Sequence, residues 1–277
     1  MTPKIVKFIN KAKNIIFADP ELIFKDEKDL VNQPFYFQGN NGKGVLLVHG
    51  WTSTAYEVRR LGKYLSEEGF TVSGPMLRGH GTQPEDLENV TYQDWLADLL
   101  KAYDELQKEC GEVYIGGTSI GASLAILLAL QRPQTKGLVL MATPYKIKLE
   151  SILEMWGKLI LPFKKYNKKF YPPTFGATTT ITRVIAYQKY STRSALEVLK
   201  LVKAVREKFA EIKQPCFLIQ SKQDHVVSHG SMDKIYEKIS SDIKKKKYIN
   251  RAYHTFISDI KNEHVFTDIL EFLKEIK

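Results

Sequence analysis

The 277-residue sequence is poor in cysteine and has no long apolar run. Its two cysteines, Cys110 and Cys216, lie far apart with no partners at metal-ligand spacing, so we expect two plain thiols and neither a disulfide nor a metal site. No apolar stretch approaches the ~20 residues of a membrane-spanning helix. Lysines interrupt the apolar residues of the first twenty positions, so the continuous hydrophobic segment of a secretory signal is missing. We therefore expect a cytoplasmic globular protein.

Positive charge, by contrast, is in excess, with a formal net charge of +10. The lysines lie in short runs, such as those at 163–170 and 244–247, among acidic helical patterns. No recognition motif of a nucleic-acid-binding domain accompanies them. We interpret them as a solvated surface and expect no nucleic-acid partner; attraction to anionic lipid surfaces or acidic substrates is the alternative.

Residues 1–34 form an N-terminal extension with a pattern of its own. Its apolar residues Ile5, Phe8, Ile9, Ile15 and Ile16 would share one face of a basic amphipathic helix. We expect this helix to pack against the body of the protein. Peripheral membrane contact and dimerisation are the alternatives, and the sequence leaves the oligomeric state open.

Short apolar runs alternate with helical patterns along most of the remaining chain. Strands are predicted at 45–48, 70–73, 113–116, 138–141, 216–219 and 247–250, and four of them are almost wholly apolar, as in strands buried on both faces. Helical periodicity is clear at 58–65, at 92–109 after a Thr91 N-cap, and at 265–273. This alternation predicts an α/β fold with a mainly parallel central sheet flanked by helices.

The alternation breaks between Met141 and Cys216, where no convincing central strand is found. The interval includes a long helical pattern at 194–212 and is too long for an ordinary connection between a helix and a strand. We therefore predict that residues 144–212 form an inserted helical cap between two parts of the core, 35–143 and 213–277. The cap would cover the carboxyl edge of the sheet, where open α/β sheets bind ligands.

Residues 117–121 read Gly-Thr-Ser-Ile-Gly and join a predicted strand to a predicted helix. Glycine costs about 0.5–1 kcal/mol relative to alanine in either element, so Gly117 and Gly121 indicate close approach of strand and helix. In the G-x-S-x-G turn the central serine stands above the sheet, next to the positive end of the helix. We predict that Ser119 is a nucleophile. A phosphate-binding turn or a merely structural turn is the alternative.

An acid and a histidine follow two later strands. Asp224 comes directly after the strand at 216–219 and His254 after the strand at 247–250, which brings both to the sheet edge that carries Ser119. The chain order Ser, Asp, His is that of the hydrolase turn. His225 and His229 are too close to Asp224 to approach it from another strand. A solvated loop acid and a surface histidine are the alternatives.

A nucleophilic serine also needs two N–H donors for the oxyanion that forms on its substrate. The amide of Ile120, directly after the serine, would supply one. The loop at 49–54 follows an early strand, and Gly50 permits a sharp turn there. We expect the amide of Trp51 to be the second donor, and its indole either to line the acyl pocket or to pack in the core.

The segments LLVHGWTSTAYEVRRLGKYLSEEGFTV, PMLRGHGTQPEDL, TYQDWLADL, IGGTSIGASLA, IQSKQDHVV and YHTF occur in this order from about residue 35 to the end. In this respect the chain resembles the small bacterial carboxylesterases and monoacylglycerol lipases of the α/β-hydrolase superfamily. The resemblance implies a nucleophile at Ser119, an acid at Asp224, a base at His254 and oxyanion amides at Trp51 and Ile120. It also implies a cap that forms the acyl site, and no metal or organic cofactor. Gly79-His80-Gly81 matches a loop near the active site of that family; we expect a structural role for His80, and a catalytic role is the alternative.

These observations lead us to expect a serine carboxylic-ester hydrolase that forms an acyl-enzyme with a small-molecule ester, one that carries an acyl chain. The same three residues also serve thioesterases, amidases and acyltransferases, and the sequence does not choose among them. A haloalkane-type dehalogenase would need a carboxylate at Ser119. In a different class, the chain would be a non-catalytic ligand-binding protein on a hydrolase scaffold.

Overall fold

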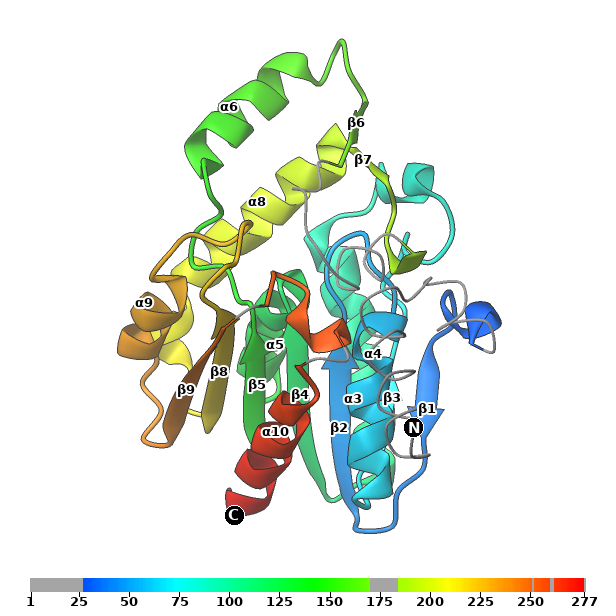
Figure 1. The fold of residues 1–277 in the computed structure, drawn as a ribbon, viewed down its shortest axis with the longest axis vertical. Helices are drawn as coiled ribbons and strands as arrows, with labels where there is room; N and C mark the ends of the chain where they lie inside the picture. The colour runs from blue at the N-terminus through cyan, green and yellow to red at the C-terminus, as the bar shows by residue number, and fades with distance from the viewer. Residues whose placement is uncertain (1–26, 170–183, 251, 260–261, 277) are drawn as a thin grey trace, which may run out of the picture.

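The computed structural model describes residues 27–169, 184–250, 252–259 and 262–276 (Figure 1). The amphipathic helix expected near the N-terminus lies outside the described residues. Within these ranges, no helix has both the length and the apolar character needed to cross a bilayer. Both cysteines are free and buried, and Cys110 packs in the core.

A seven-stranded sheet forms the centre of the molecule. Its strands in spatial order are β1 (Phe35–Phe37), β3 (Thr71–Gly74), β2 (Lys43–Val48), β4 (Glu112–Thr118), β5 (Gly137–Met141), β8 (Cys216–Ser221) and β9 (Lys244–Ile249). Only the pairing of β1 with β3 is antiparallel in this sheet, as far as the described residues go. The predicted α/β fold with a mainly parallel sheet is confirmed.

The two edge strands differ from the prediction. Strand β1 was not predicted, because it is three residues long and only Phe35 on it is buried. Strand β9 begins at Lys244, not at residue 247, and ends at Ile249. Its first four residues are lysines, a composition that an edge strand tolerates because its side chains reach solvent.

Helices cover both faces of the sheet and divide the core into two layers. Helices α3 (Tyr56–Glu67) and α10 (His264–Glu275) pack on one face, and α4 (Tyr92–Glu109), α5 (Ile120–Gln131), α8 (Thr192–Arg206) and α9 (Ser231–Lys238) on the other (Figure 1). Trp95 of α4 is fully buried in the second layer. The predicted N-cap of α4 is confirmed, since the Thr91 hydroxyl accepts the N–H of Asp94 and the Asp94 carboxylate accepts the N–H of Thr91. Short 3-10 turns occur at η1 (Lys28–Leu30), η2 (Pro84–Leu87), η3 (Phe209–Glu211) and η4 (Phe256–Ser258).

The chain between β5 and β8 lies above the carboxyl ends of the parallel strands (Figure 1). It contains α6 (Glu150–Ile160), an antiparallel pair of short strands, β6 (Tyr166–Lys168) and β7 (Lys189–Ser191), and α8. We keep the name cap for residues 144–212. The helix predicted at 194–212 ends at Arg206, because Phe209 and Ile212 are fully buried and turn into the core ahead of β8.

Helix α6 is tied to the rest of the cap at one end and exposed along its outer face. The buried Glu150 carboxylate accepts a hydrogen bond from Arg206 Nη2 at 2.6 Å, and Arg206 Nε donates to the Tyr145 carbonyl at 2.7 Å. On the outer face Met155 and Leu159 are exposed. The inner face of the same helix contributes to the cavity described below.

Candidate active site

Ser119 occupies the tight turn between β4 and α5. Its backbone has φ 55° and ψ −119°, a conformation that costs a non-glycine residue about 1–3 kcal/mol. The surrounding structure holds it there: the Ser119 N–H donates to the Met141 carbonyl of the neighbouring strand at 2.8 Å. Strain of this kind at a single polar residue is characteristic of functional turns.

The glycines on either side leave no room for a side chain. A Cβ on Gly117 would lie 2.3 Å from the carbonyl oxygen of Gly121, and a Cβ on Gly121 would lie 2.4 Å from that of Val48. Both distances are far below van der Waals contact with backbone atoms that cannot move independently. Glycine at these two positions therefore lets the helix begin directly above the strand ends, with Ser119 at the crossing point.

The structure brings Ser119, His254 and Asp224 into one chain of hydrogen bonds. His254 Nε2 lies 2.9 Å from Ser119 Oγ, and His254 Nδ1 lies 2.8 Å from Asp224 Oδ2. A carboxylate can only accept, so Nδ1 carries the hydrogen and donates it to Asp224. The lone pair of neutral Nε2 then faces the serine hydroxyl. This arrangement can remove the proton of Ser119 Oγ as that oxygen attacks an electrophile.

Asp224 is held from both sides of its carboxylate. Its Oδ1 accepts the backbone N–H groups of Val226 at 2.8 Å and Val227 at 2.9 Å, and the residue is only 4% exposed. Burial alone would raise the pKa of Asp224, but His254 and the two amides outweigh it and lower the pKa below its usual value. The carboxylate is therefore ionised where it meets the imidazole.

The contact with Asp224 also shifts the pKa of His254, in the opposite direction. Burial by itself would lower the pKa of His254, whereas the Asp224 carboxylate raises it, and the net pKa is raised above its usual value of 6.5. The imidazolium that forms when His254 takes a proton is thus stabilised in place.

Two backbone amides beside Ser119 are free to bind an oxyanion. Trp51 and Ile120 both line the cavity at the serine, and neither amide donates a hydrogen bond within the part of the chain that the structure describes. The loop that carries Trp51 is firmly held. The Gly50 N–H donates to Glu57 Oε2 at 2.7 Å, and the Trp51 indole donates to Ser194 Oγ of α8 at 2.8 Å.

Two histidines near this loop, His49 and His80, make packing and hydrogen-bond contacts within the described part of the chain, and neither is hydrogen-bonded to Ser119 there. His49 is fully buried and neutral: its Nδ1 donates to the Gly50 carbonyl at 2.9 Å and its Nε2 accepts the Leu77 N–H at 3.1 Å, while burial lowers its pKa to about 4. His80 stacks on Tyr187 and does not line the cavity. These contacts agree with the structural role expected for His80.

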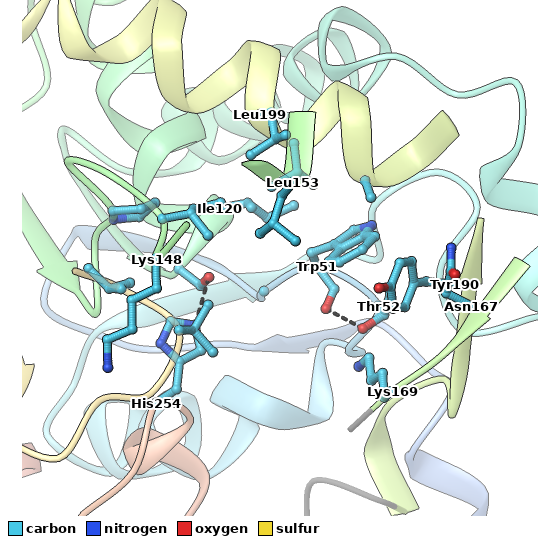
Figure 2. A pocket seen from close by; sticks show the side chains of 18 of the residues that line it. Trp51, Thr52, Ile120, Lys148, Leu153, Asn167, Lys169, Tyr190, Leu199 and His254 are labelled. Atoms are coloured by element: carbon cyan, nitrogen blue, oxygen red, sulfur yellow. Dashed lines mark hydrogen bonds between the residues drawn. The ribbon is translucent and has the colours of Figure 1, made fainter. Parts of the chain in front are cut away.

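A cavity of about 600 Å³ opens between the cap and the carboxyl edge of the sheet, with Ser119 and His254 in its wall. Apolar side chains from α6 and α8 line one part, among them Leu153, Trp156, Ile160, Leu196 and Leu199. Polar side chains line another part: Thr52, Asn167, Lys169, Tyr190 and Thr192. Figure 2 shows Leu153 and Leu199 beside Ile120, and Thr52, Asn167, Lys169 and Tyr190 gathered beyond Trp51.

A glutamate, two lysines and a histidine of this cavity were not predicted as site residues from the sequence. Glu57, Lys148, Lys169 and His225 all line it. Glu57 resembles any acidic residue in the first turn of an amphipathic helix, and Lys169 belongs to a lysine run that was interpreted as solvated surface. That interpretation was wrong for Lys169. His225 follows Asp224 directly, and only its adjacency to a candidate acid pointed to the site.

The chain matches known proteins over most of its length. Residues 39–261 match the model of the family described as serine aminopeptidase, S33. The chain is 31% identical over 241 residues to a thermostable monoacylglycerol lipase of Bacillus sp. (strain H-257), covering 87% of this chain and 93% of that protein. It is 30% identical over 250 residues to a carboxylesterase of Bacillus subtilis (strain 168), covering 90% and 99%.

Solved structures agree in fold. A metagenome-derived lipolytic enzyme superposes with a TM-score of 0.77 at 24% identity, covering 88% of this chain and 98% of that one. A monoglyceride lipase of Saccharomyces cerevisiae superposes with a TM-score of 0.74 at 16% identity, covering 88% and 92%. The chain therefore belongs to the serine aminopeptidase S33 family of α/β hydrolases, and it is an ester hydrolase of the carboxylesterase and monoacylglycerol lipase type.

Proposed function

We propose that the chain hydrolyses carboxylic esters through an acyl-enzyme on Ser119, with His254 as the general base and Asp224 as its orienting acid. The observation that carries this proposal is the continuous pair of hydrogen bonds from Ser119 Oγ through His254 to Asp224, in the wall of a cavity. The names of the two Bacillus relatives support an ester with an acyl chain as the class of substrate.

In the first half-reaction, Ser119 Oγ attacks the ester carbonyl carbon while its proton passes to His254 Nε2. Asp224 stabilises the imidazolium, and the amide N–H groups of Trp51 and Ile120 bind the oxyanion. One such donor contributes about 10²–10³-fold in hydrolases of this kind. The imidazolium then gives its proton to the alkoxy oxygen, the carbon–oxygen bond breaks, and the alcohol leaves.

In the second half-reaction, water takes the place of the alcohol. His254 accepts a proton from the water as its oxygen attacks the acyl carbon, and the same two amides hold the second oxyanion. When that intermediate collapses, His254 returns the proton to Ser119 Oγ and the carboxylic acid is released. Every proton is accounted for by His254, and the residues require no metal or organic cofactor for these steps.

Hydrolysis of p-nitrophenyl esters from acetate to palmitate, together with monoacylglycerols, tests the proposal directly. We expect kcat/KM to rise with acyl length while the apolar wall formed by Leu153, Ile160 and Leu199 gains contacts, and to fall once the chain outgrows the cavity. A thioester and an anilide of the best acyl group serve as comparisons. A folded protein inactive on every ester but active on one of these comparisons would overturn the ester assignment.

The pH dependence of kcat/KM on an uncharged ester should have an acidic limb with a midpoint above 6.5. The reason is that only neutral His254 can accept the serine proton, and the Asp224 carboxylate holds the pKa of His254 above that value. Activity is therefore lost as the pH falls through the raised pKa. A rate that stays constant well below pH 6.5 would contradict a role for His254 as the base.

A further inference from the structure

The polar part of the cavity contains a cation that the proposed reaction does not use. Lys169 follows β6, and its backbone N–H donates to the Gln188 carbonyl at 2.9 Å, which anchors the residue next to β7. Its side chain lines the cavity together with Asn167, Thr52 and Tyr190 (Figure 2). A lysine in a cavity wall is unusual, because removing an ammonium group from water is costly unless a partner replaces the water.

Among the residues that the structure describes, no such partner is found beside Lys169. In the described ranges, the Lys169 ammonium makes no hydrogen bond and no ion pair. Glu57 is the carboxylate that acts on it electrostatically, but Glu57 already accepts the Gly50 N–H at 2.7 Å and forms no ion pair with Lys169. The other lysine in the cavity wall differs, since Lys148 Nζ donates to the Asp224 carbonyl at 2.7 Å.

We propose that Lys169 binds an anionic group, a carboxylate or a phosphate, on the ester substrate at a distance from the bond that is cleaved. This inference rests on the proposed function, because it places the ester carbonyl at Ser119 and the anionic group in the polar part of the same cavity. It narrows the substrate from any acyl ester to one with a negative charge on its acyl or its alcohol part.

The chemistry of the wall fits such a group. The Tyr190 hydroxyl can donate to the anion beside the ammonium, and so can the Asn167 amide, which gives one of its two hydrogens to Thr192 Oγ1. Burial lowers the pKa of Lys169 to about 8, with Glu57 opposing the shift, so the ammonium form still prevails at neutral pH. A bound anion would replace the lost hydration and strengthen that form. Charge-assisted contacts shielded from water are among the stronger hydrogen bonds in proteins.

The test compares matched pairs of esters that differ only in the charge. On the acyl side, the pair is the mono-p-nitrophenyl ester of suberic acid, with a free carboxylate, and the same ester with that carboxylate methylated. On the alcohol side, the pair is 1-decanoylglycerol 3-phosphate and 1-decanoylglycerol. The ratio of kcat/KM, charged over neutral, is measured for each pair at high salt, which screens exposed charges and leaves a buried contact largely intact.

Wild type should prefer the charged member in one of the two pairs, and the pair that responds identifies which side of the ester carries the anion. Lys169→Met should lower that ratio by about tenfold or more, the size expected for a lost hydrogen bond to a charged group. Lys168→Met is the matched control, because it removes the same charge from the adjacent, exposed residue. That control should leave the ratio within about twofold of wild type.

Three results would overturn the proposal: a wild-type preference for the neutral member in both pairs, a ratio that Lys169→Met leaves unchanged, or a ratio that Lys168→Met lowers equally. If Lys169 only balances the charge of Glu57, Lys169→Met will lower the unfolding temperature and leave the ratio unchanged. Should Lys169→Met fail to fold, the wild-type ratios still decide whether the cavity selects an anion.

A failure of the proposed function is separable from a failure of this inference. If wild type hydrolyses neither member of any pair, calorimetric binding of monomethyl and dimethyl suberate replaces turnover, with Ser119→Ala as the host protein. Tighter binding of the charged compound to this host than to the same host with Lys169→Met would support the anionic subsite without ester hydrolysis. Equal binding to the two hosts would overturn the subsite as well.

Discussion

Replacing Ser119 with alanine is expected to lower kcat for ester hydrolysis by about 10⁴–10⁶-fold, because no other group can form the acyl-enzyme. What remains would come from the oxyanion amides and substrate binding alone. The fold should persist, since alanine meets the same backbone constraint at φ 55° and adds no atoms. Steady-state kinetics on the best p-nitrophenyl ester, together with circular dichroism, measures both effects.

Ser123, in the first turn of the helix that follows Ser119, offers a matched control. Its hydroxyl is fully buried and has no hydrogen-bond partner among the described residues, so Ser123→Ala removes the same oxygen without touching the site. We expect this variant to keep wild-type activity and to be no less stable, because an unsatisfied buried hydroxyl is lost. A fluorophosphonate probe should label wild type and Ser123→Ala but not Ser119→Ala. Labelling of Ser119→Ala, or equal losses in the two variants, would refute the nucleophile assignment.

Replacing Asp224 with asparagine is expected to cost about 10⁴-fold in kcat, even though the side chain keeps its shape. The Asn Nδ2 would donate toward His254 Nδ1 and favour the tautomer with hydrogen on Nε2, which cannot accept the serine proton. The asparagine Oδ1 can still accept the amides of Val226 and Val227, so the loop should keep its conformation.

The same variant should change the pH profile. Without the carboxylate, burial is left as the main influence on His254, and its pKa should fall, moving the acidic limb of the residual activity to lower pH. Asp233→Asn is the control, since Asp233 of α9 pairs with Lys246 of β9 and does not line the cavity. A loss below about tenfold, or an unshifted limb, would show that Asp224 does not orient His254.

Sequence reasoning succeeded where a short pattern and the topology act together. Ser119, Asp224 and His254 all follow the carboxyl ends of strands, and a parallel sheet brings those ends to one edge whatever the loops do in detail. Apolar strands such as β4 and β5 were equally visible, because burial on both faces removes alternation. The core of the fold and the grouping of these three residues could therefore be predicted, because both depend on short sequence patterns and on the parallel topology of the sheet.

Prediction from the sequence failed where the position of a side chain depends on contacts between elements that are far apart in the chain. Helix α6 has apolar residues on its outer face as well as on its inner face, so its sequence does not show which face meets the cavity. That depends on how the helix docks on α8. Lys169 looks like its neighbours Lys164, Lys165 and Lys168 in sequence, yet it alone of these lines the cavity. Glu57 is distinguished only by the Gly50 amide that it accepts, a contact between two elements that composition cannot reveal.

The positions of the chain's three tryptophans make their fluorescence sensitive to what lies under the cap. Trp95 is sealed in the core, Trp51 lies in the cavity wall beside Ser119, and Trp156 is half-exposed on α6 while also lining the cavity. A molecule that fills the cavity changes the surroundings of two indoles and leaves the third as an internal reference. The intrinsic fluorescence of the unmodified protein thus reports occupancy of the space under the cap, with no attached dye.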